Sequence, residues 1–210
     1  HYKWRTLSTI KKKFKKKKST FVEIEGTFVH YVDEGVGTPI ILLHGTGASL
    51  HTWDIWAEKL KRKYRVLRIT LPGFGLSGPH SGKKYEIKDY VNFLESFVKQ
   101  IGIKKFYLIG NSLGGSIAWL YTSIYDRRVK KLILINSSGF ESDEIPFVIK
   151  IARNKYLNFL IKKLSPQFLV KKSLKEVFYD DNLISKSIIE RYYKLNLREG
   201  NREAFIDRAL

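Results

Sequence analysis

The apolar residues in the first two thirds of the chain fall into short runs, separated by longer stretches of helical periodicity. Residues 40–43 and 132–135 are unbroken apolar runs, which are typical of strands buried on both faces of a sheet. Residues 64–69 and 106–109 also have strand patterns, whereas apolar positions in residues 87–101 recur every three or four residues. Strands that alternate with helices at this spacing predict an α/β fold, with a mostly parallel sheet flanked by helices.

The first 32 residues have a different pattern from this alternating region. Residues 1–20 are basic and weakly patterned, so they predict an N-terminal arm rather than a defined element. Residues 21–24 and 28–32 have strand-like alternation on either side of Glu25 and Gly26. Two such runs around a glycine-containing turn predict a β-hairpin at the start of the core.

The last third of the chain has the pattern of a helical domain. Beyond residue 140 the strand pattern stops, and several amphipathic helices are predicted, one of which opens at Ser165 and Pro166. We interpret this part as a lid over an active site, because no strand of the sheet resumes; ordinary packing against the sheet is the alternative. The predicted units are therefore a basic arm (1–20), the N-terminal part of the core (21–140) and a helical cap (141–210).

Residues 104–116 place a serine at a sharp turn between a strand and a helix. The strand-like run ends at Gly110, Ser112 follows two residues later, and Gly114 lies two residues further on. Larger side chains at those two flanking positions would collide at such a turn, so both glycines have a steric reason to be there. This pattern predicts a nucleophile elbow with Ser112 as the catalytic nucleophile. A serine that only caps the helix is the alternative, and it does not explain the glycines.

A nucleophilic serine needs donors for the oxyanion that forms when it attacks a carbonyl. We expect one donor to be the backbone N–H of Leu113, directly after the nucleophile. The second should come from the loop after residues 40–43, where we assign Thr46, with Gly47 as the fallback. These residues are the candidate oxyanion hole.

A nucleophilic serine also needs a histidine base that is held by an acid. His44 starts the loop that carries Thr46, where a residue normally orients the loop, so we do not assign it as the base. His30, His51 and His80 also precede Ser112, whereas this architecture orders its triad as serine, acid and histidine. We therefore expect the base to lie beyond residue 210, and the segment alone to be catalytically incomplete.

Composition narrows the chemistry further. A hydrophobic content of 43% is that of a folded globular protein. The absence of cysteine excludes a disulfide, a thiolate metal site and a cysteine nucleophile within these residues, and we expect neither a cofactor nor a metal. No run approaches the roughly 20 apolar residues of a membrane span. The first residue is His1 rather than methionine, which leaves room for an upstream signal or anchor, so the localisation stays open.

The formal net charge of +19 is the extreme value of the composition. Lysines on every solvated face would explain most of it, because lysine is rarely buried. The sharper interpretation rests on the cluster between Lys11 and Lys18, which would attract the arm to an anionic membrane surface. Nucleic acid is not an expected partner, because no recognised reading motif accompanies the charge.

Residues 73–78 formally match the dinucleotide-binding pattern G-x-G-x-x-G. That pattern should open a helix at its end, yet Pro79, Ser81 and Gly82 continue the loop. We therefore interpret these glycines as a tight loop on the rim of the active site and do not expect a nucleotide.

Three segments, residues 41–47, 71–78 and 110–115, together resemble the α/β-hydrolase superfamily in order and spacing. The match is to its serine-nucleophile branch of esterases, lipases, peptidases and C–C bond hydrolases. The resemblance implies a helical cap, and an acid and a histidine that follow the cap. A serine at position 112 argues against the haloalkane dehalogenases and epoxide hydrolases of this fold, which use aspartate there. Thr70 departs from the pattern, because the family often has aspartate there to support the following loop.

The resemblance leaves more than one function open. A serine hydrolase of the carboxylesterase or lipase type, acting on a small acyl or ester substrate, is the function we expect. A C–C bond hydrolase or a peptidase would use the same fold and nucleophile. A non-catalytic binding protein is the alternative from another class, since a chain can keep an elbow and lack the base.

Overall fold

The computed structural model describes residues 6–139, 146–158, 161–162 and 167–210 of the chain. Its centre is a six-stranded sheet with the strand order β1-β2-β4-β3-β5-β6. The first three strands in this order pair antiparallel, and the pairs from β4 to β6 are parallel, so the prediction of a mostly parallel α/β sheet is confirmed. The strands are β1 (Ser19–Ile24), β2 (Thr27–Glu34), β3 (Pro39–Leu43), β4 (Arg65–Ile69), β5 (Phe106–Asn111) and β6 (Val129–Ile135).

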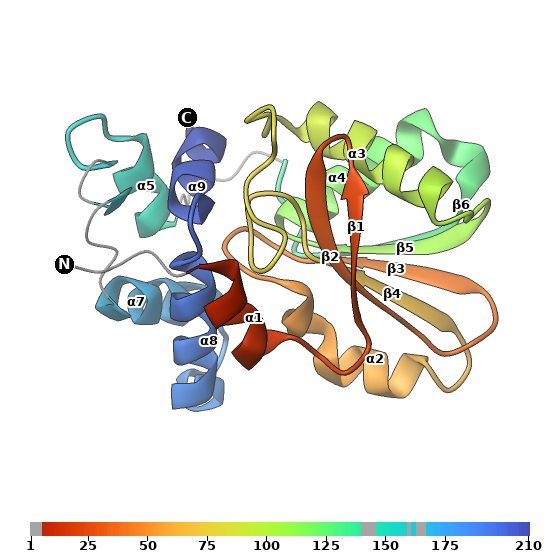
Figure 1. Ribbon diagram of the computed structural model, residues 1–210, viewed down its shortest axis with the longest axis horizontal. Helices are drawn as coiled ribbons and strands as arrows, with labels where there is room; N and C mark the ends of the chain where they lie inside the picture. Colours follow the sequence, from red (N-terminus) through yellow and green to blue (C-terminus); the bar gives the residue numbers. More distant parts are fainter. Residues whose placement is uncertain (1–5, 140–145, 159–160, 163–166) are drawn as a thin grey trace.

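Helices cover both faces of this sheet. Helix α2 (Asp54–Leu60) lies on one face, and α3 (Ile87–Gln100) and α4 (Leu113–Ile124) lie on the other (Figure 1). Successive residues of β3 point to opposite faces, so Leu42 packs with Ala57 of α2 while Ile41 joins the larger cluster under α3 and α4. Short 3-10 helices complete the connections: η1 (Leu50–Trp53), η2 (Asp126–Arg128) and η3 (Asp181–Leu183).

The predicted hairpin at the start of the core is present. Strands β1 and β2 pair up to Ile24 and Thr27, which leaves a two-residue loop of Glu25 and Gly26. Both loop residues have positive φ, 49° and 76°, as a type I′ turn requires. The twist of this turn matches that of the two strands, and it therefore fixes their register.

Strand β6 corrects one prediction, because residues 132–135 were expected to form a strand buried on both faces. Within the described residues β6 pairs with β5 alone, so it forms an edge of the sheet. Ile133 and Leu134 keep 45% and 38% of their surface exposed. An apolar run predicts a strand, but its burial depends on neighbours that the run itself does not specify.

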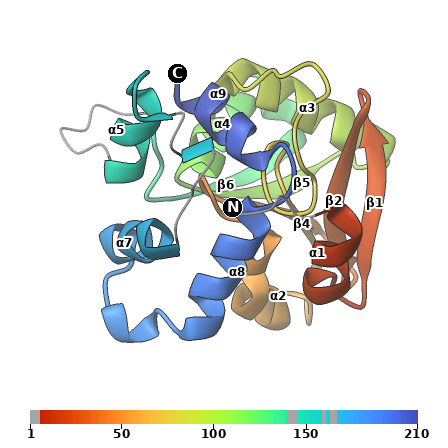
Figure 2. The ribbon, with the colours of Figure 1, turned by 60° about the vertical axis from the view of Figure 1, so that its left-hand side comes forward.

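The helices of the predicted cap, which we call the cap, gather at one end of the sheet (Figures 1 and 2). Its helices are α5 (Phe147–Arg153), α7 (Gln167–Val177), α8 (Lys186–Asn196) and α9 (Asn201–Ala209), and the described part of this region contains no strand. The helix opening predicted at Ser165 and Pro166 lies outside the described residues, as does the domain boundary predicted at residue 140.

The cap docks on the glycine-rich loop of residues 73–78. The Asn201 Nδ2 donates to the Gly75 carbonyl oxygen at 3.0 Å. A Cβ on Gly78 would lie 1.0 Å from the Arg198 guanidinium, so this glycine leaves room for a cap side chain. We predicted from the sequence that the loop of residues 73–78 lies at the edge of the active site. In the structure this loop contacts the N-terminus of α9.

The basic arm is also seated on the core and the cap. Residues 1–20 gave a weak pattern, yet Leu7–Phe14 form a helix, α1, which lies beside α8 in both views (Figures 1 and 2). Ile10 is 2% exposed and packs with Leu76 of the core and Leu195 of α8. Among the described helices, α1 included, none has the length and apolar character needed to cross a bilayer.

Candidate active site

Ser112 occupies a strained turn between β5 and α4. Its backbone has φ 50° and ψ −117°, a conformation that costs a residue with a Cβ of order 1–3 kcal/mol. A Cβ on Gly110 would lie 2.1 Å from the Gly114 carbonyl oxygen, and a Cβ on Gly114 would lie 2.3 Å from the Leu43 carbonyl oxygen. The structure therefore gives both glycines the steric role that the sequence pattern suggested.

Backbone hydrogen bonds hold this turn from two sides. The Ser112 N–H donates to the Ile135 carbonyl oxygen at 3.1 Å. The Ser112 carbonyl oxygen accepts from the Gly115 N–H at 2.8 Å and from the Ser138 N–H at 3.2 Å. The serine is thus fixed between its own helix and the segment that follows β6, and this fixation helps to maintain the strained backbone.

The residues that we call the oxyanion loop, His44 to Ser49, lie directly against the elbow. A Cβ on Gly45 would lie 3.1 Å from the Ser112 Cβ, so the two backbones approach closely. Thr46 and Gly47 line the same cavity as Ser112. Leu113 is the first residue of α4, where an N–H has no acceptor within the helix and the helix dipole favours negative charge. The four predicted residues are therefore brought together.

His44 orients this loop. Its Nδ1 donates to the Gly45 carbonyl oxygen at 2.8 Å, and its Nε2 accepts from the Leu71 N–H at 3.0 Å. The ring is fully buried, and burial lowers its pKa to about 4. Both ring nitrogens are occupied by backbone groups, which agrees with the assignment of His44 as a residue that positions the loop.

The other described histidines are bonded elsewhere. His30 contacts Ser19 at 2.7 Å, His51 contacts Ser49 at 2.9 Å, and His80 accepts from a backbone N–H at 3.0 Å. Among the described residues that line the cavity, none is a histidine or a carboxylate. Nor do three metal-binding side chains meet anywhere in the described ranges. The described lining residues therefore place no histidine and no carboxylate beside Ser112.

A cavity of 460 Å³ opens between the elbow and the cap. The core contributes Thr46, Gly47, Ser112 and Ser138, and the cap contributes the remaining described lining residues. Most of these are apolar, such as Val148, Ile149, Leu169, Val170, Leu174 and Phe205. A site of this size fits a small organic molecule.

Thr70 supports the glycine-rich loop that follows it. The α/β-hydrolase family often has aspartate at this position. The Thr70 Oγ1 accepts from the Leu50 N–H at 3.3 Å and contacts the His30 Nδ1 at 3.4 Å. Its carbonyl oxygen accepts from the Ser77 hydroxyl at 2.5 Å. The support passes through Thr70 and Ser77, and Thr70 is fully buried.

Sequence reasoning missed several residues of this site. Ser138 follows β6, and the rule that ligands lie at the carboxyl ends of parallel strands could have indicated it. Asn201 and Phe205 come from the cap, where no local pattern relates a residue to the cavity. Their positions depend on how the cap docks.

The comparisons with known proteins agree with this architecture. A family model described as alpha/beta hydrolase fold matches residues 38–168, more than half of the chain. The chain belongs to the alpha/beta hydrolase family. The match includes the oxyanion loop, the glycine-rich loop and the elbow.

Individual relatives are more distant, and they are longer. The chain is 27% identical over 177 residues to a 2-hydroxy-6-oxo-2,4-heptadienoate hydrolase of Pseudomonas putida, covering 82% of this chain and 60% of that protein. It is 29% identical over 167 residues to Epoxide hydrolase 4 of Mus musculus, covering 75% and 46%. The crystal structure of the Cif epoxide hydrolase from Acinetobacter nosocomialis matches with a TM-score of 0.82 at 20% identity. The match covers 97% of this chain and 69% of that chain, and at this identity it shows a shared fold alone. The chain thus spans 60% or less of the length of these two curated relatives.

Proposed function

We propose that this chain carries the nucleophile, the oxyanion hole and the cap of a serine hydrolase that acts on a small ester or related acyl substrate. The observation that carries the proposal is the backbone of Ser112, held at φ 50° between β5 and α4 beside an apolar cavity. A strained conformation at a concave site is more economically explained by catalysis than by capping, since an ordinary N-cap residue adopts an extended conformation.

In this proposal the Ser112 Oγ attacks the substrate carbonyl carbon and its proton passes to a histidine. The carbonyl oxygen becomes an oxyanion that accepts hydrogen bonds from the N–H groups of Leu113 and Thr46, with Gly47 as the fallback for the second donor. Loss of one such donor typically costs about 3 kcal/mol of transition-state stabilisation. The alcohol then leaves, and water hydrolyses the acyl-serine in the reverse sequence.

The acid and the histidine are proposed to come from sequence beyond residue 210. Support comes from the cavity, where the described lining residues include no histidine and no carboxylate, and from the 60% coverage of a longer relative. The 210-residue chain should therefore turn over a short aryl ester far more slowly than the protein with its natural continuation, because triad members act as a unit. Equal turnover by both would place the base within these residues and would reopen the roles of His44 and His51.

The apolar lining of the cavity supports an acyl substrate with a hydrocarbon body. A C–C bond hydrolase is the second candidate, because the first relative is named a hydrolase of a dienoate and the nucleophile chemistry would be shared. A panel of aryl esters and vinylogous diketones offered to the same full-length protein separates the two.

Covalent labelling of the full-length protein with a fluorophosphonate tests the alternative of a non-catalytic binding protein. We expect Ser112→Ala to abolish labelling. Ser123→Ala is the matched control, because Ser123 lies on the same helix with its hydroxyl bonded to the Leu120 carbonyl oxygen. Labelling that persists in Ser112→Ala, or that is absent from the natural protein, would overturn the proposal.

The basic arm is proposed to contact an anionic membrane surface. Lys13 and Lys16 are already engaged in ion pairs with Glu190 and Asp54, so the proposal rests on the exposed Lys12, Lys15, Lys17 and Lys18. Each charge near such a surface contributes about 1 kcal/mol. Replacing these four lysines by glutamine should abolish the salt-sensitive binding to phosphatidylserine vesicles, and unchanged binding would refute it.

A further inference from the structure

The oxyanion loop is anchored at its two ends and bare at its tip. At the first end, His44 bonds the Gly45 carbonyl oxygen and the Leu71 N–H. At the tip, a Cβ on Gly47 would meet no atom within 4 Å, so the space beside this residue is open, and the Ala48 N–H donates to the Gly45 carbonyl oxygen at 3.2 Å. The orientation of the Thr46 and Gly47 N–H groups therefore depends on this turn and on the two ends of the loop, of which the second is at Ser49.

A single histidine connects this second end to the basic arm. The His51 Nε2 lies 2.9 Å from the Phe14 carbonyl oxygen, and its Nδ1 lies 2.9 Å from the Ser49 Oγ. A carbonyl oxygen can only accept, so the Nε2 carries the proton and the Nδ1 accepts from the Ser49 hydroxyl. The ring is 6% exposed, and its burial lowers its pKa to about 4, so it is neutral at physiological pH.

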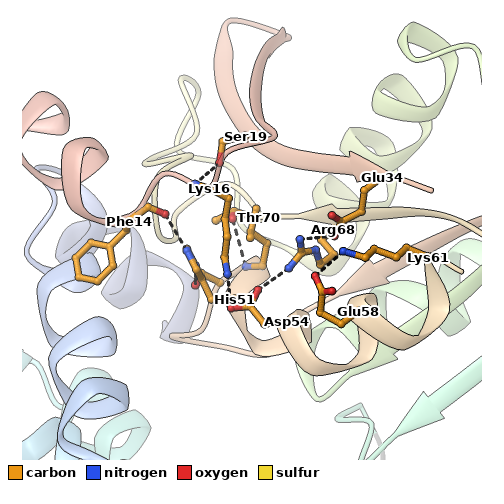
Figure 3. Close-up of polar contacts among 12 residues, drawn as sticks. Phe14, Lys16, Ser19, Glu34, His51, Asp54, Glu58, Lys61, Arg68 and Thr70 are labelled. Atoms are coloured by element: carbon orange, nitrogen blue, oxygen red, sulfur yellow. Dashed lines mark hydrogen bonds and ion pairs between the residues drawn. The ribbon is translucent and has the colours of Figure 1, made fainter.

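The arm end of this connection is held independently of His51. Lys13 pairs with Glu190 of α8 at 2.8 Å, and Lys16 pairs with Asp54 of α2 at 2.6 Å. Asp54 also receives the nearly buried Arg68 at 2.5 Å, and Figure 3 shows Phe14, Lys16 and Arg68 converging on His51 and Asp54. Phe14 is thus a fixed point, supported by both the cap and the core.

We propose that His51 is a positioning residue through which the docked arm holds the oxyanion loop in the shape that presents Thr46 to the nucleophile. The connection runs from the Phe14 carbonyl oxygen through the imidazole to the Ser49 hydroxyl, and from Ser49 along the backbone to the loop. This inference rests on the proposed function of Ser112. It gives residues 6–18 a part in catalysis although none of them lines the cavity.

The test uses the full-length protein and compares kcat with KM on an aryl ester that the natural protein hydrolyses. His51→Ala should lower kcat on the order of 10-fold, less than the 10²–10³-fold of removing an oxyanion donor outright. KM should change less than about 2-fold, because His51 does not line the cavity and an oriented donor acts mainly on the transition state. His51→Gln, which keeps an N–H for the Phe14 carbonyl oxygen, should recover part of the loss and guards against a variant that fails to fold.

The arm is tested by the same measurement. Ile10→Asp should release α1, because Ile10 is 2% exposed in its packing with Leu76 and Leu195. It should lower kcat to the same extent as His51→Ala, and the double variant should be no slower than either single variant, since both break one connection. Lys88→Ala, at an exposed position of α3, is the control and should leave kcat unchanged.

These outcomes separate the inference from the proposed function. A natural protein without hydrolysis or labelling overturns the function of Ser112 itself. If the natural protein is active but folded His51→Ala and Ile10→Asp keep its kcat, the positioning role is wrong. It is equally wrong if the two substitutions reduce kcat multiplicatively, because independent effects would then replace a shared connection.

Discussion

Strands β3 and β6 carry nearly the same apolar sequence, Ile-Ile-Leu-Leu and Leu-Ile-Leu-Ile, and have opposite surroundings. β3 lies between β4 and β5, and its Ile41, Leu42 and Leu43 are fully buried. β6 has β5 on one side, and its Ile133 is 45% exposed. The difference shows that neighbouring strands, rather than composition, decide how much an apolar strand contributes to stability. Substitutions in the central strand should therefore lower the free energy of unfolding far more than substitutions in the edge strand.

The largest effect on stability is expected from a drop in pH, because the buried histidines lie around the central strands and not at β6. Burial lowers the pKa of His30 to about 3 and the pKa values of His44 and His51 to about 4, from an ordinary 6.5. Below pH 6.5 the unfolded chain binds protons that the folded chain does not, so stability is full above this pH and falls as the pH drops toward 4. At pH 5.5 each histidine should cost roughly 1.4 kcal/mol, about 4 kcal/mol in all.

Urea unfolding at pH 7.5 and pH 5.5 measures this loss. His51→Gln should remove about one third of the acid sensitivity, because it deletes one of the three groups. A free energy of unfolding that does not change between the two pH values would contradict the expectation.

The next contrast compares truncations in the two strands. Leu42→Ala should lower the free energy of unfolding by about 3 kcal/mol, because Leu42 packs with Trp53, Ala57 and Val66 and truncation leaves a cavity. Ile133→Ala should cost less than about 1 kcal/mol, since solvent already covers much of that side chain. Similar losses in chemical denaturation would mean that β6 is covered as completely as β3.

A smaller effect is expected where β3 meets the elbow. Gly114→Ala would bring its Cβ within 2.3 Å of the Leu43 carbonyl oxygen, and relief of that clash should cost about 2 kcal/mol and displace Ser112. Gly82→Ala is the control, because its Cβ would meet only ordinary contacts, the nearest at 3.5 Å. Thermal unfolding and the rate of fluorophosphonate labelling of the full-length protein report the two consequences, and unchanged labelling in Gly114→Ala would contradict the steric account.

The smallest effect on stability is expected from a charge on β6. Leu134→Lys should change the free energy of unfolding by less than about 0.5 kcal/mol, because Leu134 is 38% exposed. It should nevertheless reduce concentration-dependent association of the 210-residue chain, since lysine on an open edge opposes strand pairing. Sedimentation velocity over a range of concentrations checks this, and equal association of both chains would show that the edge is not the contact.

The features that could be predicted from the sequence are those in which local sterics dictate the residue type. The elbow glycines, the Glu25-Gly26 turn and the alternation of strands and helices each follow from neighbours within a few positions. The docked helix Leu7–Phe14 was not predicted, because its one buried anchor, Ile10, lies among lysines and finds its partners in Leu76 and Leu195. Contacts between segments so far apart leave no local periodicity.

The candidate site divides in the same way. Ser112, Leu113 and Thr46 could be placed because each follows a strand in a fixed pattern. The link from Phe14 through His51 to Ser49 could not, because it depends on a backbone carbonyl oxygen, and a carbonyl carries no sequence signal. Ser138 was not predicted, although the end of the strand before it was. Nothing in the sequence of residues 136–139 distinguishes a site residue from a residue of an ordinary turn.

The close fit between Gly78 and Arg198 has a consequence for exchanging parts among relatives. The space beside Gly78 is filled by the guanidinium, and any side chain at this position would overlap it. A cap transplanted from another member of the family would bring its own residue to this place, and a core with a larger residue at position 78 could not accept this cap. Chimeras should therefore assemble only when residues 78 and 198 are exchanged together. The pair of Gly78 and Arg198 thus restricts which caps can combine with which cores.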